Sequence, residues 1–285
     1  EMLKQRILTA LVLLAILLPA LFHPSPVAFT AVVLVLMAAA AWEWGRLNAC
    51  GPVGSVLVGA ACLALCAASW ALGWVQRPLG VLWLAGGGCW VLGSAWLLRA
   101  GVPGWPRVPA ALRLVAGIAA LWMAWMAVVQ ARALGVNFLL SVMCLVWMAD
   151  IAAYFAGRKF GLRFTRAKLA PSISPGKSWE GVWGGVAGVL LLALGWVLAD
   201  AHFQPDQPSF YTVVARQGWW MLLVVALFMT AMSVAGGLVG SLIKRQIGLK
   251  DSSQLLPGHG GVLDRVDALL PTLPLALMIT TLLSP

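Results

Sequence analysis

The chain has 285 residues, of which 62% are hydrophobic and only 10% are charged. A soluble core of this size could not bury so much apolar surface, which excludes a separate soluble domain and predicts that a bilayer solvates most of the chain. The formal net charge of +10 does not indicate a nucleic-acid binder, because the basic residues fall in short loops between apolar runs.

Apolar runs recur along the whole sequence and predict an all-α, polytopic integral membrane bundle. A spanning helix needs roughly 20 mostly apolar residues. The first run follows Lys4 and Arg6, as in a signal peptide, but no A-x-A-like cleavage site follows it, so we expect it to remain as a span. About nine spans are predicted, at residues 7–22, 27–44, 53–75, 79–98, 111–129, 136–156, 181–199, 218–243 and 266–283.

The basic residues indicate how these spans are oriented. Cytoplasmic loops of membrane proteins collect Lys and Arg. With the N-terminus inside, only Arg77, Arg132 and Arg216 of the 19 Lys and Arg residues lie on the other side. We therefore expect a bacterial cytoplasmic (inner) membrane protein whose loops 157–180 and 244–265 both face the cytoplasm.

The two parts of the chain differ in chemistry. Residues 1–135, with five spans, are predicted to pack and to face lipid, whereas residues 136–285, with four spans, are predicted to be catalytic. Glu43 is the one acid within the predicted spans of the first part, near the cytoplasmic end of its span, and we expect a structural role for it. Spans rich in small residues permit a homodimer. The 200–217 loop is interpreted as a solvated connector.

A first chemical segment, Asp150 to Arg158, ends the sixth span. An ionised aspartate in an apolar helix is costly, so Asp150 should face a partner or a wet cavity. Tyr154 lies four residues further and shares its helix face. The alternative is an interfacial aspartate beside Arg158.

A second segment, Ser174-Pro175-Gly176-Lys177-Ser178-Trp179-Glu180-Gly181, precedes the seventh span. Ser174, Lys177 and the positive helix end would suit a phosphate. The spacing is not that of a Walker A loop. The alternative is a helix N-cap with Trp179 as an interfacial anchor.

The third segment, residues 241–267, is the densest in chemistry. Asp264 and Asp267 are three apart, share a face if helical, and could hold Mg2+ beside substrate phosphates. The glycines around His259 would let backbone N–H groups approach a ligand. A positive-inside connecting loop is the alternative, but it does not explain a Gly-His-Gly-Gly turn before an acid pair. Cations that could neutralise phosphate oxygens are Lys244, Arg245, Lys250 and Arg265.

This third segment resembles the signature of the phosphatidate cytidylyltransferases, also called CDP-diacylglycerol synthases. It matches the patterns S-x-x-K-R, K-D, P-x-H-G-G and D-R-x-D in residue type and spacing. The first and second segments resemble conserved stretches of the same enzymes. The resemblance implies transfer of a cytidylyl group from CTP to phosphatidic acid, giving CDP-diacylglycerol and pyrophosphate in phospholipid biosynthesis, with Mg2+ required.

The resemblance also implies roles for individual residues. His259 would orient a phosphate or position the glycine turn, and is not expected to be a general base, because a phosphate monoester is already an anionic nucleophile. The implied metal ligands are Asp264 as the leading one, with Asp267, Asp251 and Asp150. The implied catalytic residues are Asp264, Asp267, Lys244, Arg245 and His259. The implied substrate-binding residues are Ser241, Lys250, Arg265, Gly260, Gly261, Ser174, Lys177 and Tyr154.

The stretch before the Lys-Arg pair departs from the family pattern at Gly237, and Gly240 also occupies a position often held by Glu. Where the family usually reads G-D-L-x-x-S, this chain has Gly236-Gly237-Leu238-Val239-Gly240-Ser241. Gly237 thus stands in the place of a metal-binding carboxylate, and its absence should weaken Mg2+ binding. Either Asp150, Asp264 and Asp267 suffice, or the chain is a weakened or altered paralogue.

Other functions compete with this hypothesis. A CTP-dependent polyprenol or phytol kinase is a near neighbour. From a different class, the chain could transport an anionic substrate, with Asp150 lining the path. A transporter should carry polar groups at mid-bilayer depth, whereas these acids cluster at the cytoplasmic ends of spans. A catalytically silent homologue is the third alternative.

Overall fold

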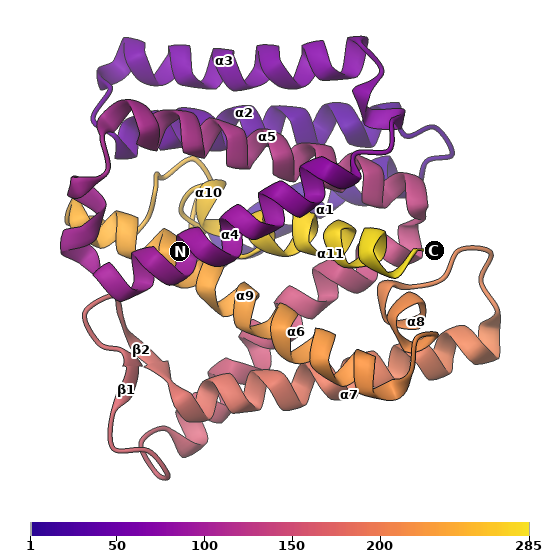
Figure 1. Cartoon of the computed structure of the whole chain (residues 1–285). Coiled ribbons are helices and arrows are strands. Elements are labelled where there is room, and N and C mark those ends of the chain that lie inside the picture. The colour runs from indigo at the N-terminus through magenta and orange to yellow at the C-terminus, as the bar shows by residue number, and fades with distance from the viewer. Residues whose placement is uncertain (1, 285) are drawn as a thin grey trace.

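A computed structural model describes residues 2–284 of the chain, which form a bundle of helices with one small hairpin (Figure 1). Over this range nine helical segments are long and apolar enough to cross a membrane. The long helices are α1 (Met2–Phe22), α2 (Val27–Leu47), α3 (Gly51–Ala71), α4 (Gly80–Ala100), α5 (Ala110–Leu134), α6 (Val136–Phe160), α7 (Trp179–Phe203), α9 (Trp219–Gln246) and α11 (Leu269–Leu283). The short elements are η1 (Trp74–Gln76), η2 (Val102–Arg107), β1 (Lys168–Ala170), β2 (Ser174–Ser178), α8 (Phe210–Ala215) and α10 (Leu263–Val266).

The predicted all-α, polytopic membrane bundle is confirmed, and each predicted span corresponds to one helical segment. The ninth segment begins with α10 and continues through α11. The third span ends earlier than predicted, at Ala71. The reason is Gly73, whose φ of 69° is left-handed and turns the chain into η1.

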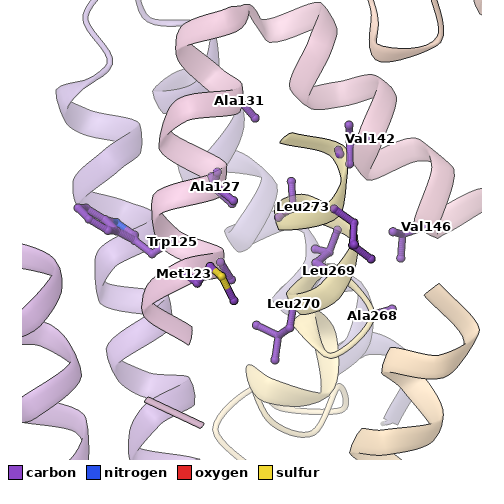
Figure 2. Packing of buried hydrophobic residues seen from close by; sticks show 14 of the residues in the cluster. Met123, Trp125, Ala127, Ala131, Val142, Val146, Ala268, Leu269, Leu270 and Leu273 are labelled. Atoms are coloured by element: carbon purple, nitrogen blue, oxygen red, sulfur yellow. The ribbon is translucent and has the colours of Figure 1, made fainter. Parts of the chain in front are cut away.

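The centre of the bundle is built around α5 and α11. Figure 2 shows Met123 of α5, Val142 of α6 and Leu273 of α11 directed into the same packed region. Trp125 of α5 is fully buried and its indole N–H donates to the backbone carbonyl of Thr30 in α2. The outer helix α1, by contrast, keeps many long aliphatic side chains exposed, as a lipid-facing helix should.

Helices α6 and α7 pack closely because glycines line their interface. A Cβ added at Gly181 would lie 2.9 Å from the carbonyl oxygen of Ala153, and one at Gly185 would lie 2.9 Å from that of Ala149. Only glycine permits such close backbone approach. Between the two helices, β1 and β2 form an antiparallel hairpin that the sequence did not predict.

The prediction that residues 200–217 form a solvated connector is wrong for most of its second half. This segment contains α8, whose Phe210 and Tyr211 are each 1% exposed. The Tyr211 hydroxyl donates to the Ser141 carbonyl at 2.9 Å, and burial raises the pKa of this hydroxyl, so it stays a donor. In Figure 1, α8 and the C-terminal end lie at the opposite end of the bundle from the β1–β2 hairpin.

Candidate active site

The chemical segments converge at the hairpin end of the bundle. The C-terminal half of α6 carries Asp150, β2 carries Lys177, the end of α9 carries Lys244, and α10 with its flanks carries Asp264 and Asp267. Helices α6, α9 and α11 contact one another, and β2 contacts α6 and α9. Residues separated by more than a hundred positions are thereby brought to one end of the bundle.

Asp264 lies within hydrogen-bond distance of four protein donor groups, of which the Ser252 hydroxyl is shared with Glu43. Its Oδ1 accepts a hydrogen bond from Lys244 Nζ at 2.6 Å, the one ion pair among residues 2–284. Its Oδ2 accepts from the Ser252 N–H at 2.8 Å, the Ser252 hydroxyl at 3.0 Å and the Gly261 N–H at 2.9 Å. Asp264 therefore fastens the loop of residues 251–263 to the end of α9.

Asp267 is placed differently from Asp264. Its Oδ1 accepts from the Ala268 N–H at 2.7 Å. Its Oδ2 has no hydrogen-bond donor among the described residues and would lie 3.0 Å from a Cβ added at Gly240. Gly240 thus leaves room for this carboxylate against α9, and one of its oxygens stays open for a ligand.

Asp150 and Lys177 complete the charged cluster around Asp267. Asp150 interacts electrostatically with Lys177 and Arg265, and Asp267 interacts with Lys177, Lys244 and Asp150. Lys177 reaches the cluster beside Gly237, where an added Cβ would lie 3.1 Å from Nζ. The position at which the family carries a carboxylate is therefore next to an ammonium group in this chain.

The glycine turn around His259 is shaped by its backbone. Gly258 and Gly260 have φ values of 74° and 81°, which only glycine adopts without strain. The His259 N–H donates to the Leu256 carbonyl at 2.8 Å. Its Nδ1 is buried without a partner among the described residues. The N–H of Gly261 is already taken by Asp264, so the turn offers fewer free backbone donors than the sequence suggests.

Several predicted site residues lie at the edge of the cluster. The Tyr154 hydroxyl accepts from Arg158 at 3.1 Å, and this tyrosine is 59% exposed. Arg245 is exposed and donates to the Ile173 carbonyl of the hairpin at 3.4 Å. Ser241 and Asp251 are half-buried, as is Ser174 in β2, while Lys250 and Arg265 are exposed.

The segment before α7 forms a cap. Ser178 accepts a hydrogen bond from the Gly181 N–H at 3.1 Å, the N-cap that was the alternative interpretation. Glu180 is 7% exposed, and its Oε1 accepts from the backbone N–H groups of Phe164 and Thr165 and from the Thr165 hydroxyl. Lys177, next to this cap, is the member of the segment that reaches the charged cluster.

Glu43 was expected only to be structural, yet it lies against the site. It is fully buried in α2 and accepts four hydrogen bonds from residues 252–263. The signal in the sequence was a lone acid in an apolar span near the predicted cytoplasmic end. Sequence spacing could not show its partners, because they lie more than 200 positions away.

A cavity of about 740 Å³ extends from the cluster into the bundle. Lys244, Asp264 and Asp267 line its polar end, and the remainder is lined mostly by apolar side chains of α2, α4, η2 and α5. Along α4 its lining residues run from Leu82 to Leu97, about 22 Å at 1.5 Å per helical residue. This shape suits a molecule with a charged head and a long apolar tail.

The donor set can be tested against a divalent cation. No group of three or more His, Cys, Asp or Glu side chains is arranged as a metal site within residues 2–284. Mg2+, however, is commonly held by one or two carboxylates together with water and substrate phosphates. Asp150 and the open Oδ2 of Asp267 fit that pattern, whereas the oxygens of Asp264 are occupied by protein donors.

Comparisons with known proteins agree with the motif resemblance. The sequence profile described as "Cytidylyltransferase family" matches residues 4–283. The chain is similar to the phosphatidate cytidylyltransferase of Pseudomonas aeruginosa, with 38% identity over 96% of this chain and 95% of that protein. It is also similar to the enzymes of the same name from Haemophilus influenzae (47% identity over 49% of this chain and 44% of that protein) and Brucella suis (44% identity over 47% and 43%).

Proposed function

This chain belongs to the cytidylyltransferase family, and from that premise we propose that it transfers a cytidylyl group from CTP to phosphatidic acid. The observation that carries the choice of a lipid acceptor is the cavity, which joins a charged end at Lys244, Asp264 and Asp267 to a long apolar interior. A nucleotide triphosphate and a lipid phosphate could share the charged end while the acyl chains lie in the interior. The products are CDP-diacylglycerol and pyrophosphate.

The reaction requires little covalent chemistry from the protein. An oxygen of the lipid phosphate forms a bond to the α-phosphorus of CTP, and the bond from that phosphorus to the oxygen bridging to the β-phosphate breaks, releasing pyrophosphate. The lipid phosphate is already an anion, so no general base is needed. The main demand is to hold two polyanions together and to stabilise the charge that builds on the leaving group.

The cations of the cluster meet this demand in the proposal. Lys244 and Lys177 lie at the cluster itself, while Lys250, Arg245 and Arg265 are exposed around its edge. Phosphate oxygens entering the site would compete with Asp264 for Lys244. The role of His259 in orienting a phosphate or positioning the glycine turn stays a prediction, since its Nδ1 is buried and the residue does not line the cavity.

Asp267 and Asp150 are the residues proposed to hold Mg2+, with Asp251 at the edge. A bound Mg2+ would neutralise charge on the phosphate oxygens. Asp264 supports the same region by fastening Lys244 and the 251–263 loop. We also propose placement in the bacterial inner membrane with the site on the cytoplasmic side, an orientation that the distribution of Lys and Arg supports. The homodimer stays a prediction.

The proposal is tested with purified protein, phosphatidic acid, Mg2+ and CTP labelled on either the α- or the γ-phosphate. We expect the α-label, and not the γ-label, to enter the lipid. Transfer of the γ-label would indicate a lipid kinase instead, and absence of both labels from the lipid would contradict the proposal. Asp267→Asn should lower turnover by about 10²-fold or more, because it removes the charge of the open carboxylate.

A further inference from the structure

We propose that Glu43 is a positioning residue for the cytidylyl transfer, acting through Ser252 on Asp264 and through the start of α10 on the glycine turn. The inference rests on the proposed function and assigns a part in it to a helix of the N-terminal half. Glu43 does not line the cavity, so its effect must pass through the residues it binds.

The carboxylate of Glu43 is fully buried and is surrounded by donors. Its Oε1 accepts from the Ser253 hydroxyl at 2.5 Å and from the Val262 N–H at 3.0 Å. Its Oε2 accepts from the Ser252 hydroxyl at 3.1 Å and from the Leu263 N–H at 2.7 Å. A buried carboxylate is tolerated only when its oxygens are bonded in this way. Residues near both ends of the 251–263 loop thus donate hydrogen bonds to the Glu43 carboxylate.

Gly261 shows how closely the loop fits around Glu43. A Cβ at this position would lie 2.0 Å from the Ser252 hydroxyl oxygen and 2.5 and 2.7 Å from the two Glu43 oxygens. The glycine is therefore required for contact with α2, and not for a turn of positive φ. Its N–H meanwhile donates to Asp264.

Ser252 connects the two acids. Its hydroxyl oxygen lies 3.1 Å from Glu43 Oε2 and 3.0 Å from Asp264 Oδ2. A hydroxyl has a single proton to donate, so Ser252 can donate to only one of the two carboxylates at a time. A change at Glu43 is therefore expected to alter the hydrogen bond between the Ser252 hydroxyl and Asp264, and through Asp264 the position of Lys244.

The N-terminal helix α1 supports the tip of the same loop. The Arg6 Nε donates to the Gly258 carbonyl at 2.9 Å, and the Thr9 hydroxyl donates to the Pro257 carbonyl at 2.9 Å. These contacts flank His259 on its N-terminal side, whereas Glu43 holds the segment that follows it. The turn is thus fixed from two helices of the N-terminal half.

The test uses Glu43→Gln in the full-length protein. Glutamine keeps the shape but has one acceptor oxygen and turns an NH2 group toward donors. We expect kcat per folded protein to fall by about 10²-fold, the cost of misplacing reacting groups, with KM for phosphatidic acid changed less than about threefold. A purely structural role would instead lower the thermal midpoint and leave kcat per folded protein unchanged, which would overturn the proposal.

The variants Ser252→Ala and Ser253→Ala test whether the effect of Glu43 passes through Ser252 to Asp264. If Glu43 acts partly through Ser252, then Glu43→Gln should lower kcat less in the Ser252→Ala protein than in the wild type, because interacting residues are not additive; the remaining loss is the part that passes through Val262 and Leu263. In the Ser253→Ala protein, whose lost hydroxyl contacts Glu43 but not Asp264, Glu43→Gln should still lower kcat. Multiplicative effects of Glu43→Gln and Ser252→Ala would contradict the route.

Amide hydrogen exchange separates this proposal from the proposed function, since it needs no turnover. The N–H groups of Val262 and Leu263 should be protected in the wild type and should exchange at least about tenfold faster in Glu43→Gln. Glu180→Gln is the matched control: it alters another buried carboxylate that holds a loop, and should leave exchange at these two amides unchanged. Equal exchange in wild type and Glu43→Gln would refute the positioning role even if the enzyme is active, and lack of transferase activity would refute only the function.

Discussion

A side chain at Gly237 would lie beside the ammonium group of Lys177. The carboxylate that the family carries at this position is absent here, so the site has one negative charge fewer. Lys177 lies within electrostatic range of Asp150 and Asp267. The same two acids are the proposed Mg2+ ligands. Because Lys177 interacts with the same two carboxylates, it should weaken their binding of Mg2+.

Gly237→Asp should therefore strengthen Mg2+ binding. The new carboxylate would pair with Lys177, free the neighbouring acids and add a negative charge. We expect the Mg2+ concentration for half-maximal activity to fall about tenfold, equivalent to roughly 1.4 kcal/mol. Mn2+ binding measured by paramagnetic resonance provides a second readout.

Gly237→Asn is the control, because it matches the size of aspartate without its charge. Equal behaviour of the Asp and Asn variants would show that charge at this position is immaterial. A wild type without activity that becomes active as Gly237→Asp would instead identify a degenerate site.

How far the site could be predicted differs between neighbouring acids. The motif spacing correctly placed Asp264 and Asp267 together with Lys244 at one end of the bundle. It could not show which carboxylate oxygens remain open, because the Asp264 oxygens are filled by Ser252 and Gly261 through the folding of the loop. The contacts of Glu43 with the site could not be predicted for the same reason, since its donors come from the far end of the chain.

Among the elements, α4 presents two very different faces. Gly93 lines the cavity, and a Cβ added there would meet no atom within 4 Å. Gly88 is equally free of neighbours within 4 Å, but it is not part of the cavity lining. A side chain at Gly93 can therefore fill the cavity without disturbing the packing of α4, and the same side chain at Gly88 lies outside the cavity.

Gly93→Phe should raise KM for long-chain phosphatidic acid by about tenfold, because the ring would occupy volume that the acyl chains need, while KM for CTP should hardly change. A loss of this size corresponds to roughly 1.4 kcal/mol of binding. A short-chain substrate should be affected less. Gly88→Phe should behave as wild type. Equal effects of the two variants would show that the acyl chains do not bind in this cavity.

Element prediction succeeded for the spans and failed for the hairpin. Long apolar runs are unambiguous, so every span was found, with ends shifted by several residues. Strand β2 carries Pro175 and Gly176, which both disfavour strands and mark turns. The buried helix α8 was missed because six residues are too few to show a periodic pattern.

At the scale of the whole molecule, the N-terminal and C-terminal halves are joined at the site. The division into a packing half and a catalytic half stays a prediction, but Glu43 and Arg6 show that the first half holds the loop of the second. All of the proposed chemistry requires the hairpin and the 251–263 loop to lie at one face of the membrane. The distribution of Lys and Arg predicts this arrangement.

The most direct measurement is the labelling of single cysteines in sealed vesicles, in a protein whose five native cysteines are replaced by alanine. Arg166→Cys in the hairpin segment and Lys250→Cys before the 251–263 loop should react with an impermeant reagent from the same side, the cytoplasmic one. Arg216→Cys, after α8, should react only from the opposite side. Labelling of positions 166 and 250 from opposite sides would mean that the charged cluster cannot form at one membrane face, and the proposed cytidylyl transfer would have no site.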